Sequence, residues 1–224
     1  MTRIALWRRL IAETLGSCLL AGVVIGSGIL AVRLAGGNDA VALIANTAAT
    51  AAILFVLITA LGPISGAHFN PAVSLVATLR GELSAMNLVL YALAQTLGCV
   101  LGAWLAHAMF ALPIMQVSTH VRAGPAQVLS EAVATFALVF TIIMVSRWRP
   151  QAVAAAVALV IAAGYWWTSS TSFANPAITL ARALSDTFAG VRPADAPGFI
   201  AGQLAGAIAA WAVSAALLRE PRAA

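Results

Sequence analysis

The amino-acid sequence predicts an all-α membrane protein in which six transmembrane helices and two re-entrant half-helices form two inverted repeats. Three observations lead to this fold class. The 224-residue chain is 62% hydrophobic and only 8% charged, whereas about 25% of the residues in an average soluble domain are charged. The apolar residues are gathered into six long runs. A polar motif, Asn-Pro-Ala, occurs twice between these runs.

Each of the six runs is long enough to cross a bilayer, because a transmembrane helix needs about 20 mostly apolar residues. They cover about residues 8–32, 40–61, 86–110, 127–146, 150–168 and 197–218. We do not expect the first run to be a signal peptide, because it is too long, contains Glu13 and has no clear cleavage site. Aromatic residues near the expected span ends suit the interfacial belts: Trp7, Trp148, Tyr165, Trp166 and Trp167.

All twelve basic residues are arginines, and their distribution predicts the orientation of the chain. Cytoplasmic loops carry an excess of basic residues. With six spans and a cytoplasmic N-terminus, the inner segments hold Arg3, Arg8, Arg9, Arg80, Arg147, Arg149, Arg219 and Arg222. The outer segments then hold Arg33, Arg122, Arg182 and Arg192. We therefore expect both termini in the cytoplasm, and we attribute the net charge of +5 to orientation and not to nucleic-acid binding.

The spans repeat as two sets of three. Glu13 and Glu131 occupy equivalent positions in the first and fourth spans, and Gln95 and Gln203 do so in the third and sixth. Because three is an odd number, the two sets lie in opposite orientations, which places a pathway at their interface. We therefore expect a first repeat, an outer connecting loop and a second repeat at residues 1–115, 116–126 and 127–224.

Each Asn-Pro-Ala motif reads as the start of a short helix. Asparagine is a favoured N-cap, and proline is favoured at the first helical position. We expect half-helices at about residues 70–79 and 175–184. The surrounding segments, Gly62–Arg80 and Ser169–Asp186, are too polar and too short in their apolar parts to span. The first should therefore enter from the cytoplasm through Gly62–Phe69, and the second from the opposite side.

Two helix N-termini that meet at mid-membrane would repel cations, because each carries roughly half a positive charge. Asn70 and Asn175 would cap their own helices and point their amide NH₂ groups into the lumen, which interrupts a proton-conducting chain of water. Backbone carbonyl groups of the two loops would supply acceptors along the rest of the path. The expected pore-lining residues are Gly66, Ala67, His68, Phe69, Thr171, Phe173 and Ala174.

The doubled motif, the segment Ser65–Val73, the segment Ala12–Gly16 and the paired glutamines resemble the aquaporin (major intrinsic protein) family. The resemblance covers about Arg9 to Leu218. It implies an aquaporin-like right-handed bundle, a pore in each subunit and a homotetramer. For a bacterial member it also implies the inner membrane. It implies no enzymatic activity, no cofactor and no metal.

The selectivity filter departs from the family pattern. In most of the family an arginine follows the second motif, but this chain has Ile178 at that position. The family spacing places the other filter positions at Thr50, Ala163 (or Gly164 after a one-residue shift) and Ser172. Such a ring has neither large side chains nor a fixed charge. We therefore predict a wide, weakly polar filter that passes neutral solutes larger than water.

This filter resembles that of bacterial aquaglyceroporin-type members associated with arsenic resistance. The resemblance implies a passive channel for water, glycerol-like polyols and arsenous acid. Arg182, one helical turn beyond Ile178, or Arg122 on the outer loop would restore a cation barrier near the filter. Alternatively, Arg182 pairs with Asp186 at i+4.

Other functions remain open at this stage. One is a water-selective aquaporin. Another is a secondary transporter, since inverted repeats serve both classes, but a carrier needs a coupling carboxylate in its pathway. Glu13 and Glu131 are the only carboxylates within spans, and their symmetric positions favour a scaffold role for them and for Gln95 and Gln203, holding the re-entrant loops. No metal-ligand cluster or nucleophile–base motif indicates an enzyme.

Overall fold

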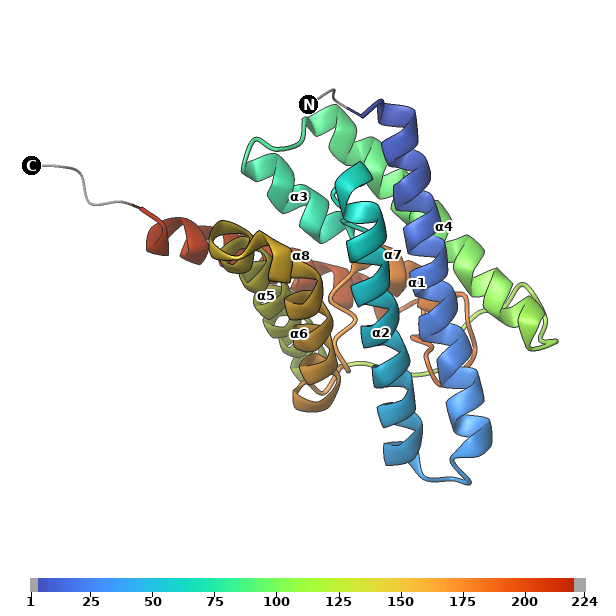
Figure 1. Cartoon of the computed structure of the whole chain (residues 1–224). Coiled ribbons are helices and arrows are strands. Elements are labelled where there is room, and N and C mark those ends of the chain that lie inside the picture. The colour runs from blue at the N-terminus through green and yellow to red at the C-terminus, as the bar shows by residue number, and fades with distance from the viewer. Residues whose placement is uncertain (1–3, 220–224) are drawn as a thin grey trace, which may run out of the picture.

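The structure, a computed structural model, describes residues 4–219. Arg3 and Arg222, two of the arginines from which the orientation was predicted, lie outside the described residues. Within the described range the structure contains α-helices, one short 3₁₀-helix and no strand (Figure 1). The helices are α1 (Leu6–Leu34), α2 (Asp39–Ser65), α3 (Pro71–Leu79), α4 (Ala85–Met109), α5 (Pro125–Trp148), η1 (Pro150–Ala152), α6 (Val153–Trp167), α7 (Pro176–Ala183) and α8 (Ala196–Leu217).

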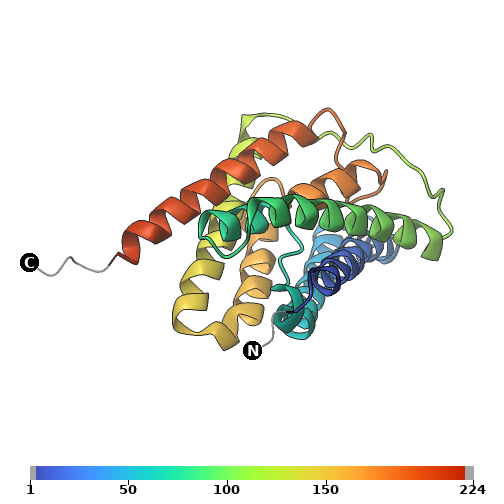
Figure 2. The same cartoon turned by 90° about the horizontal axis from the view of Figure 1, so that it is seen from above.

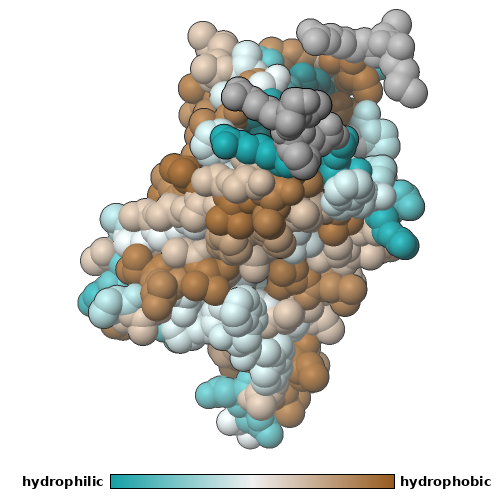
Figure 3. Space-filling model, turned by 90° about the vertical axis from the view of Figure 1, so that its left-hand side faces the viewer, coloured by the Kyte–Doolittle hydropathy of each residue, from teal (hydrophilic) through white to brown (hydrophobic). Residues whose placement is uncertain are grey.

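Within residues 4–219, six segments are long and apolar enough to cross a membrane: α1, α2, α4, α5, α6 together with η1, and α8. The chain is therefore a multi-pass membrane protein. Large apolar side chains are exposed along these helices, for example Leu15 and Leu19 on α1 and Leu93 and Leu97 on α4. Figure 3 shows hydrophobic residues over much of the middle of one face, with hydrophilic residues near its upper and lower ends and along its sides. This distribution suits a bilayer, which covers an apolar belt between two polar ends.

The helices form two groups of three with the two short helices between them (Figures 1 and 2). Helix α1 packs against α2 and α4, α5 packs against α6 and α8, and α2 joins the groups by packing against α6. Each half-helix contacts the last span of the opposite group, α3 against α8 and α7 against α4, and the half-helices also contact each other. The half-helices thus connect the two groups by contacting both of them at the centre of the molecule.

Glycines allow the closest helix contacts within each group. A Cβ atom at Gly98 of α4 would lie 2.3 Å from the Thr14 carbonyl oxygen of α1. The equivalent contact in the second group is closer still, since a Cβ atom at Gly206 of α8 would lie 2.0 Å from the Ala132 carbonyl oxygen of α5. Small residues at helix interfaces let the backbones approach in this way.

The first re-entrant loop is shorter than the sequence predicted. Helix α2 continues through Pro63 to Ser65, so Gly62–Ser65 are helical and the extended part is limited to Gly66–Asn70. The helix ends at Gly66, whose φ of 90° is left-handed and whose N–H donates to the Gly62 carbonyl oxygen at 3.0 Å. This is a glycine C-cap, which needs no side chain at the left-handed position.

Candidate pore

The first re-entrant loop is held by the buried carboxylate of Glu13 on α1. Its Oε1 accepts hydrogen bonds from the Ser65 hydroxyl group at 2.6 Å and from the His68 backbone N–H at 3.0 Å. Its Oε2 accepts from the Phe69 backbone N–H at 2.7 Å and from the Gln95 amide at 2.8 Å. Both carboxylate oxygens of Glu13 therefore accept hydrogen bonds that fix the loop.

The second loop repeats this arrangement around the buried carboxylate of Glu131 on α5. Glu131 accepts from the Ser170 hydroxyl group at 2.5 Å and from the backbone N–H groups of Phe173 and Ala174 at 2.9 and 2.8 Å. The Gln203 amide donates to it at 2.6 Å. The two loops are thus anchored by the same set of contacts in the two halves of the chain.

The paired glutamines also fasten the half-helices. The Gln95 amide nitrogen donates to the Ser74 hydroxyl oxygen of α3 at 2.9 Å, and the Gln203 amide nitrogen donates to the Thr179 hydroxyl oxygen of α7 at 2.9 Å. Each glutamine therefore joins a carboxylate, a loop and a half-helix in one polar network. Such networks in a low-dielectric interior are rigid when their donors are satisfied.

The loops adopt a strained backbone conformation that these anchors maintain. Positive φ angles of 48–60° occur at Ala67, Phe69, Thr171, Ser172 and Ala174. A left-handed conformation at a residue other than glycine costs about 1–3 kcal/mol and persists only where the surroundings impose it. The carboxylate anchors supply that constraint, and the loops remain extended at the depth of the half-helices.

Asn70 caps α3 and also reaches the opposite half. Its Oδ1 accepts from the Ala72 N–H at 2.9 Å, and its Nδ2 donates to the Ala174 carbonyl oxygen at 2.7 Å. Asn175 is the counterpart on α7, because its Oδ1 accepts from the Ala177 N–H at 3.0 Å and its Nδ2 donates to the Phe69 carbonyl oxygen at 2.8 Å. The two motifs therefore hold each other across the interface between the halves.

These cross-contacts correct part of the sequence prediction. A primary amide has two N–H bonds, and in Asn70 and Asn175 one of them is used by the opposite loop. Each side chain therefore keeps one N–H for the lumen and not a whole NH₂ group. The Phe69 and Ala174 carbonyl oxygens each accept one of these cross-contacts, which uses one of the two lone pairs of each oxygen.

A cavity of about 320 Å³ passes both motifs. One end is lined by Arg80 and Glu82, which form an ion pair at 2.7 Å. The other end is lined by Ser172, Ile178 and Arg182, and we call it the Arg182 mouth. The predicted pore residues that line the cavity are Asn70, Asn175, Gly66, Ala67, His68, Phe69, Phe173 and Ala174. Thr171 is not among the lining residues, so that prediction was wrong.

The filter prediction was wrong at its position on the fifth span. Thr50, Ser172 and Ile178 line the cavity. Ala163 of α6 is exposed on the surface of the protein and does not line the cavity. Gly164 is buried behind the second loop, where a Cβ atom would lie 2.5 Å from the Ser172 hydroxyl oxygen. Tyr165 lines the cavity instead.

Tyr165 is a cavity-lining residue that the sequence did not predict, because it was assigned to an aromatic belt. It is 4% exposed, and its hydroxyl oxygen lies 3.2 Å from the Thr50 hydroxyl oxygen. The signal was present in the helical period. Val157 and Ile161 precede Tyr165 at four-residue spacing, and all three line the cavity.

Arg182 lies at the mouth of the cavity and does not pair with Asp186. Its side chain is 3% exposed, its Nε donates to the Ala189 carbonyl oxygen, and its Cζ lies 3.3 Å from the centroid of the Phe173 ring. The Asp186 carboxylate accepts instead from the N–H and hydroxyl groups of Thr119, at 2.8 and 2.9 Å. The predicted alternative, an Arg182–Asp186 pair, is therefore wrong.

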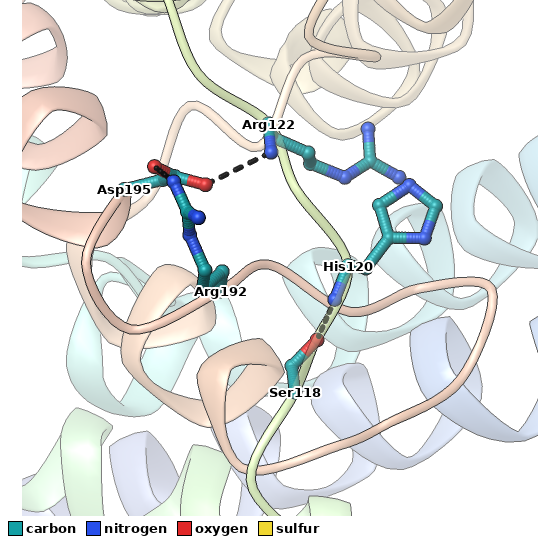
Figure 4. A network of polar contacts seen from close by, with 5 residues as sticks. All are labelled: Ser118, His120, Arg122, Arg192 and Asp195. Atoms are coloured by element: carbon teal, nitrogen blue, oxygen red, sulfur yellow. Dashed lines mark hydrogen bonds and ion pairs between the residues drawn. The ribbon is translucent and has the colours of Figure 1, made fainter.

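Arg122 reaches the same aromatic ring from the connecting loop. Its Nε donates to the Gly190 carbonyl oxygen at 2.9 Å, and its Cζ lies 5.2 Å from the Phe173 centroid. Figure 4 shows how this loop is fixed, since the Arg122 backbone N–H donates to Asp195 at 2.9 Å and Asp195 pairs with Arg192 at 2.8 Å. Arg122 and Arg182 thus bring two guanidinium groups to the Phe173 ring.

His120 adds a titratable group beside this pair. Figure 4 shows its ring next to the Arg122 guanidinium group, and its backbone N–H donates to the Ser118 hydroxyl oxygen at 3.2 Å. Partial burial, and then the positive charges of Arg122 and Arg182, hold the pKa of His120 below its usual value. The lowered pKa favours the neutral form of the imidazole ring.

In the described part of the chain, six membrane-length helices and two half-helices surround an internal cavity, which is a membrane channel architecture. Comparisons with known proteins agree with this class. The sequence model of the major intrinsic protein family matches residues 1–150, and the chain belongs to this family. The aquaporins and aquaglyceroporins of this family are channels and not enzymes.

Individual relatives extend the match over the whole chain. The aquaglyceroporin AqpS of Rhizobium meliloti (strain 1021) is 53% identical over 222 residues, which cover 99% of this chain and 95% of that protein. The aquaporin TIP4-4 of Zea mays is 35% identical over 141 residues, covering 60% of this chain and 56% of that protein. The aquaglyceroporin structure from Plasmodium falciparum has a TM-score of 0.74 at 19% identity, covering 94% and 95% of the two chains, and so shares the fold.

Proposed function

We propose that the chain is a passive channel for small uncharged solutes: water, glycerol-like polyols and arsenous acid. The observation that carries the proposal is the cavity itself, which passes both Asn-Pro-Ala motifs and has Ile178 where most of the family has an arginine. The relative that is 53% identical is named an aquaglyceroporin, which supports solutes larger than water. We also propose a homotetramer in the bacterial inner membrane, with both termini cytoplasmic.

The filter suits a solute with both hydroxyl groups and an apolar side. Thr50, Tyr165 and Ser172 contribute hydroxyl groups to the wall, and Ile178 contributes an apolar surface. A polyol that enters can exchange hydrogen bonds with water for bonds to these hydroxyl groups, which lowers the cost of dehydration. Arsenous acid is a neutral trihydroxy species, so it presents the same pattern. Tyr165 makes this ring narrower than the Thr50/Ala163/Ser172/Ile178 ring expected from the sequence.

Proton exclusion would follow from the two motifs. The N-termini of α3 and α7 bring positive potential to the point where the half-helices meet. Asn70 and Asn175 each keep one N–H bond for the lumen. A water molecule between them accepts two hydrogen bonds and turns its own hydrogens away, so a continuous chain of donors and acceptors is broken.

Two features favour a channel over a coupled carrier. The intramembrane carboxylates Glu13 and Glu131 are fully buried, and the oxygen atoms of both accept bonds from the loops and glutamines. We therefore propose that these residues, with Gln95 and Gln203, act as a scaffold. The matching networks also support the division into repeats at residues 1–115 and 127–224, joined by 116–126.

The filter is tested by replacing Ile178 with a charged side chain. Ile178→Arg should lower glycerol and arsenous acid uptake into proteoliposomes by about tenfold or more, which corresponds to about 1.4 kcal/mol in the barrier. The long side chain fills the space opposite the hydroxyl groups. Ile178→Val is the matched control and should keep the uptake of both solutes. Equal uptake by wild type and Ile178→Arg would refute the proposed filter.

We further propose that Arg122 and Arg182 supply the cation barrier that Ile178 cannot. The double variant Arg122→Ala, Arg182→Ala should conduct monovalent cations measurably in planar bilayers, because two positive charges leave the mouth of the cavity. Arg33→Ala is the control, since Arg33 lies over Phe110 and does not line the cavity. Unchanged cation exclusion in the double variant would assign the barrier to the half-helices alone.

A further inference from the structure

The guanidinium groups at the Arg182 mouth lack an anionic partner. Among residues 4–219, the ion pairs are Arg80–Glu82 and Arg192–Asp195, and neither includes Arg122 or Arg182. Arg182 is the more buried of the two and lines the cavity. Within the same range its Nε is bonded, whereas its terminal nitrogens form no hydrogen bond. A charge at 3% exposure without a counter-ion is unusual, because burial of an unpaired charge is costly.

The nearby carboxylates are engaged elsewhere. Asp186 accepts from Thr119 through both its N–H and hydroxyl groups. Asp195 pairs with Arg192 and accepts from the Arg122 backbone. Glu131 is bonded to the second loop. The positive charge of the mouth is therefore stabilised by carbonyl groups and by the Phe173 ring, and the two free donor nitrogens remain available to a ligand.

We propose that the Arg182 mouth is a binding site for a small monovalent anion with an oxygen head group, such as a carboxylate or sulfonate. The terminal nitrogens of Arg182 form a planar fork that matches two oxygens of such a group. Arg122, over the same ring, adds a second positive charge. Because Arg182 lies one helical turn from Ile178, a bound anion stands in front of the filter and obstructs neutral solutes. The obstruction rests on the proposed channel function.

The first experiment measures glycerol flux in the presence of methanesulfonate, which is anionic at every accessible pH. Proteoliposomes carry equal methanesulfonate on both sides, in a buffer whose other anion is chloride, which has no pair of oxygens to match the Arg182 fork. Glycerol flux should fall with a half-maximal concentration on the order of 1–10 mM, as expected for a weak single site. Dimethyl sulfone, the uncharged analogue, should leave the flux unchanged. Equal inhibition by the sulfone, or passage of methanesulfonate through the protein, would overturn the proposal.

Variants separate the site from a general ionic effect. Arg182→Gln should abolish inhibition by methanesulfonate, and Arg182→Lys should weaken it several-fold because an ammonium group lacks the fork. Arg33→Gln, outside the cavity, should keep both the flux and the inhibition. Inhibition that persists in Arg182→Gln at the wild-type concentration would contradict the site.

Calorimetry keeps the two proposals distinguishable. Methanesulfonate should bind the purified wild-type protein in detergent with a millimolar Kd, and Arg182→Gln should show no binding. If glycerol flux is absent but this difference is found, the channel proposal fails and the anion site stands. If flux is present and neither inhibition nor binding occurs, the anion site fails alone.

Discussion

At the scale of single residues, Tyr165 and Thr50 bring two hydroxyl groups together in the wall of the cavity, and we expect this contact to set the polarity of the proposed filter. A buried hydroxyl group needs a partner. Each of the two hydroxyl groups provides one for the other and keeps further hydrogen-bonding capacity for a solute. The Tyr165 ring also occupies space in the cavity wall, so we expect this one residue to influence both the size and the polarity of the solutes that pass.

Two substitutions at Tyr165 separate these effects. Tyr165→Ala should raise the flux of polyols larger than glycerol, because it removes an aromatic ring from the cavity wall. Tyr165→Phe keeps the ring but leaves the Thr50 hydroxyl group without its partner, at a cost of about 1 kcal/mol. It should lower glycerol flux while leaving the size cut-off unchanged. Stopped-flow measurement of the flux of polyols of increasing size provides the test. If Tyr165→Ala passes the same polyols at the same relative rates as the wild type, this role of Tyr165 is contradicted.

At this scale, local motifs were the reliable source of prediction. Asn70, Asn175 and Ile178 were located because the motif fixes them within a few residues of a helix start. Ala163 was placed on the cavity by counting along the chain, which does not determine the rotation of α6 about its axis. The contacts of Arg182 with Phe173 and Ala189 depend on the fold of a loop, and no periodic pattern in the sequence predicts them.

At the scale of helices, the contact between α1 and α4 depends on the absence of side chains. Gly98 leaves no space for a Cβ atom, whose nearest neighbours would be the Thr14 carbonyl oxygen at 2.3 Å and the Ser17 Cβ at 2.9 Å. Overpacking of this kind forces the backbones apart. Since Glu13 lies next to Thr14 on α1, a displaced α1 would also move the anchor of the first loop.

Gly98→Ala should therefore destabilise the protein by about 1–3 kcal/mol, even though alanine has the higher helix propensity. Gly62→Ala is the matched control, because Gly62 also lies inside a helix but a Cβ atom added there would meet no atom within 4 Å. It should be neutral or stabilising. Thermal unfolding in detergent measures both. A Gly98→Ala protein as stable as Gly62→Ala would show that α1 and α4 are not in backbone contact.

Helix boundaries were predictable where capping residues mark them. The half-helices were expected at about 70–79 and 175–184 and are found at Pro71–Leu79 and Pro176–Ala183. The end of α2 was not predicted, because the polar start of the segment Gly62–Arg80 indicated a loop, whereas the helix continues through Pro63 and stops at Gly66. A proline lacks one N–H group, and a membrane helix can accommodate that loss.

At the scale of the whole molecule, the two halves place equivalent groups on opposite sides of one cavity. Glu13 and Glu131 hold the loops, and Asn70 and Asn175 each donate to the other half. Both carboxylates are thereby fixed, whereas a coupled carrier needs one that can bind and release its ion during alternating access. The fold class followed from apolar runs and the repeated motif, but the shape of the cavity required the side-chain positions.

The dependence of initial glycerol flux on the glycerol gradient tests passive conduction most directly. In proteoliposomes of the purified protein, a channel gives a flux that rises linearly with the gradient and does not change when a pH gradient is imposed. The continuous cavity past both motifs predicts this result for glycerol and arsenous acid. A flux that saturates and follows the pH gradient would contradict it and would indicate a proton-coupled carrier.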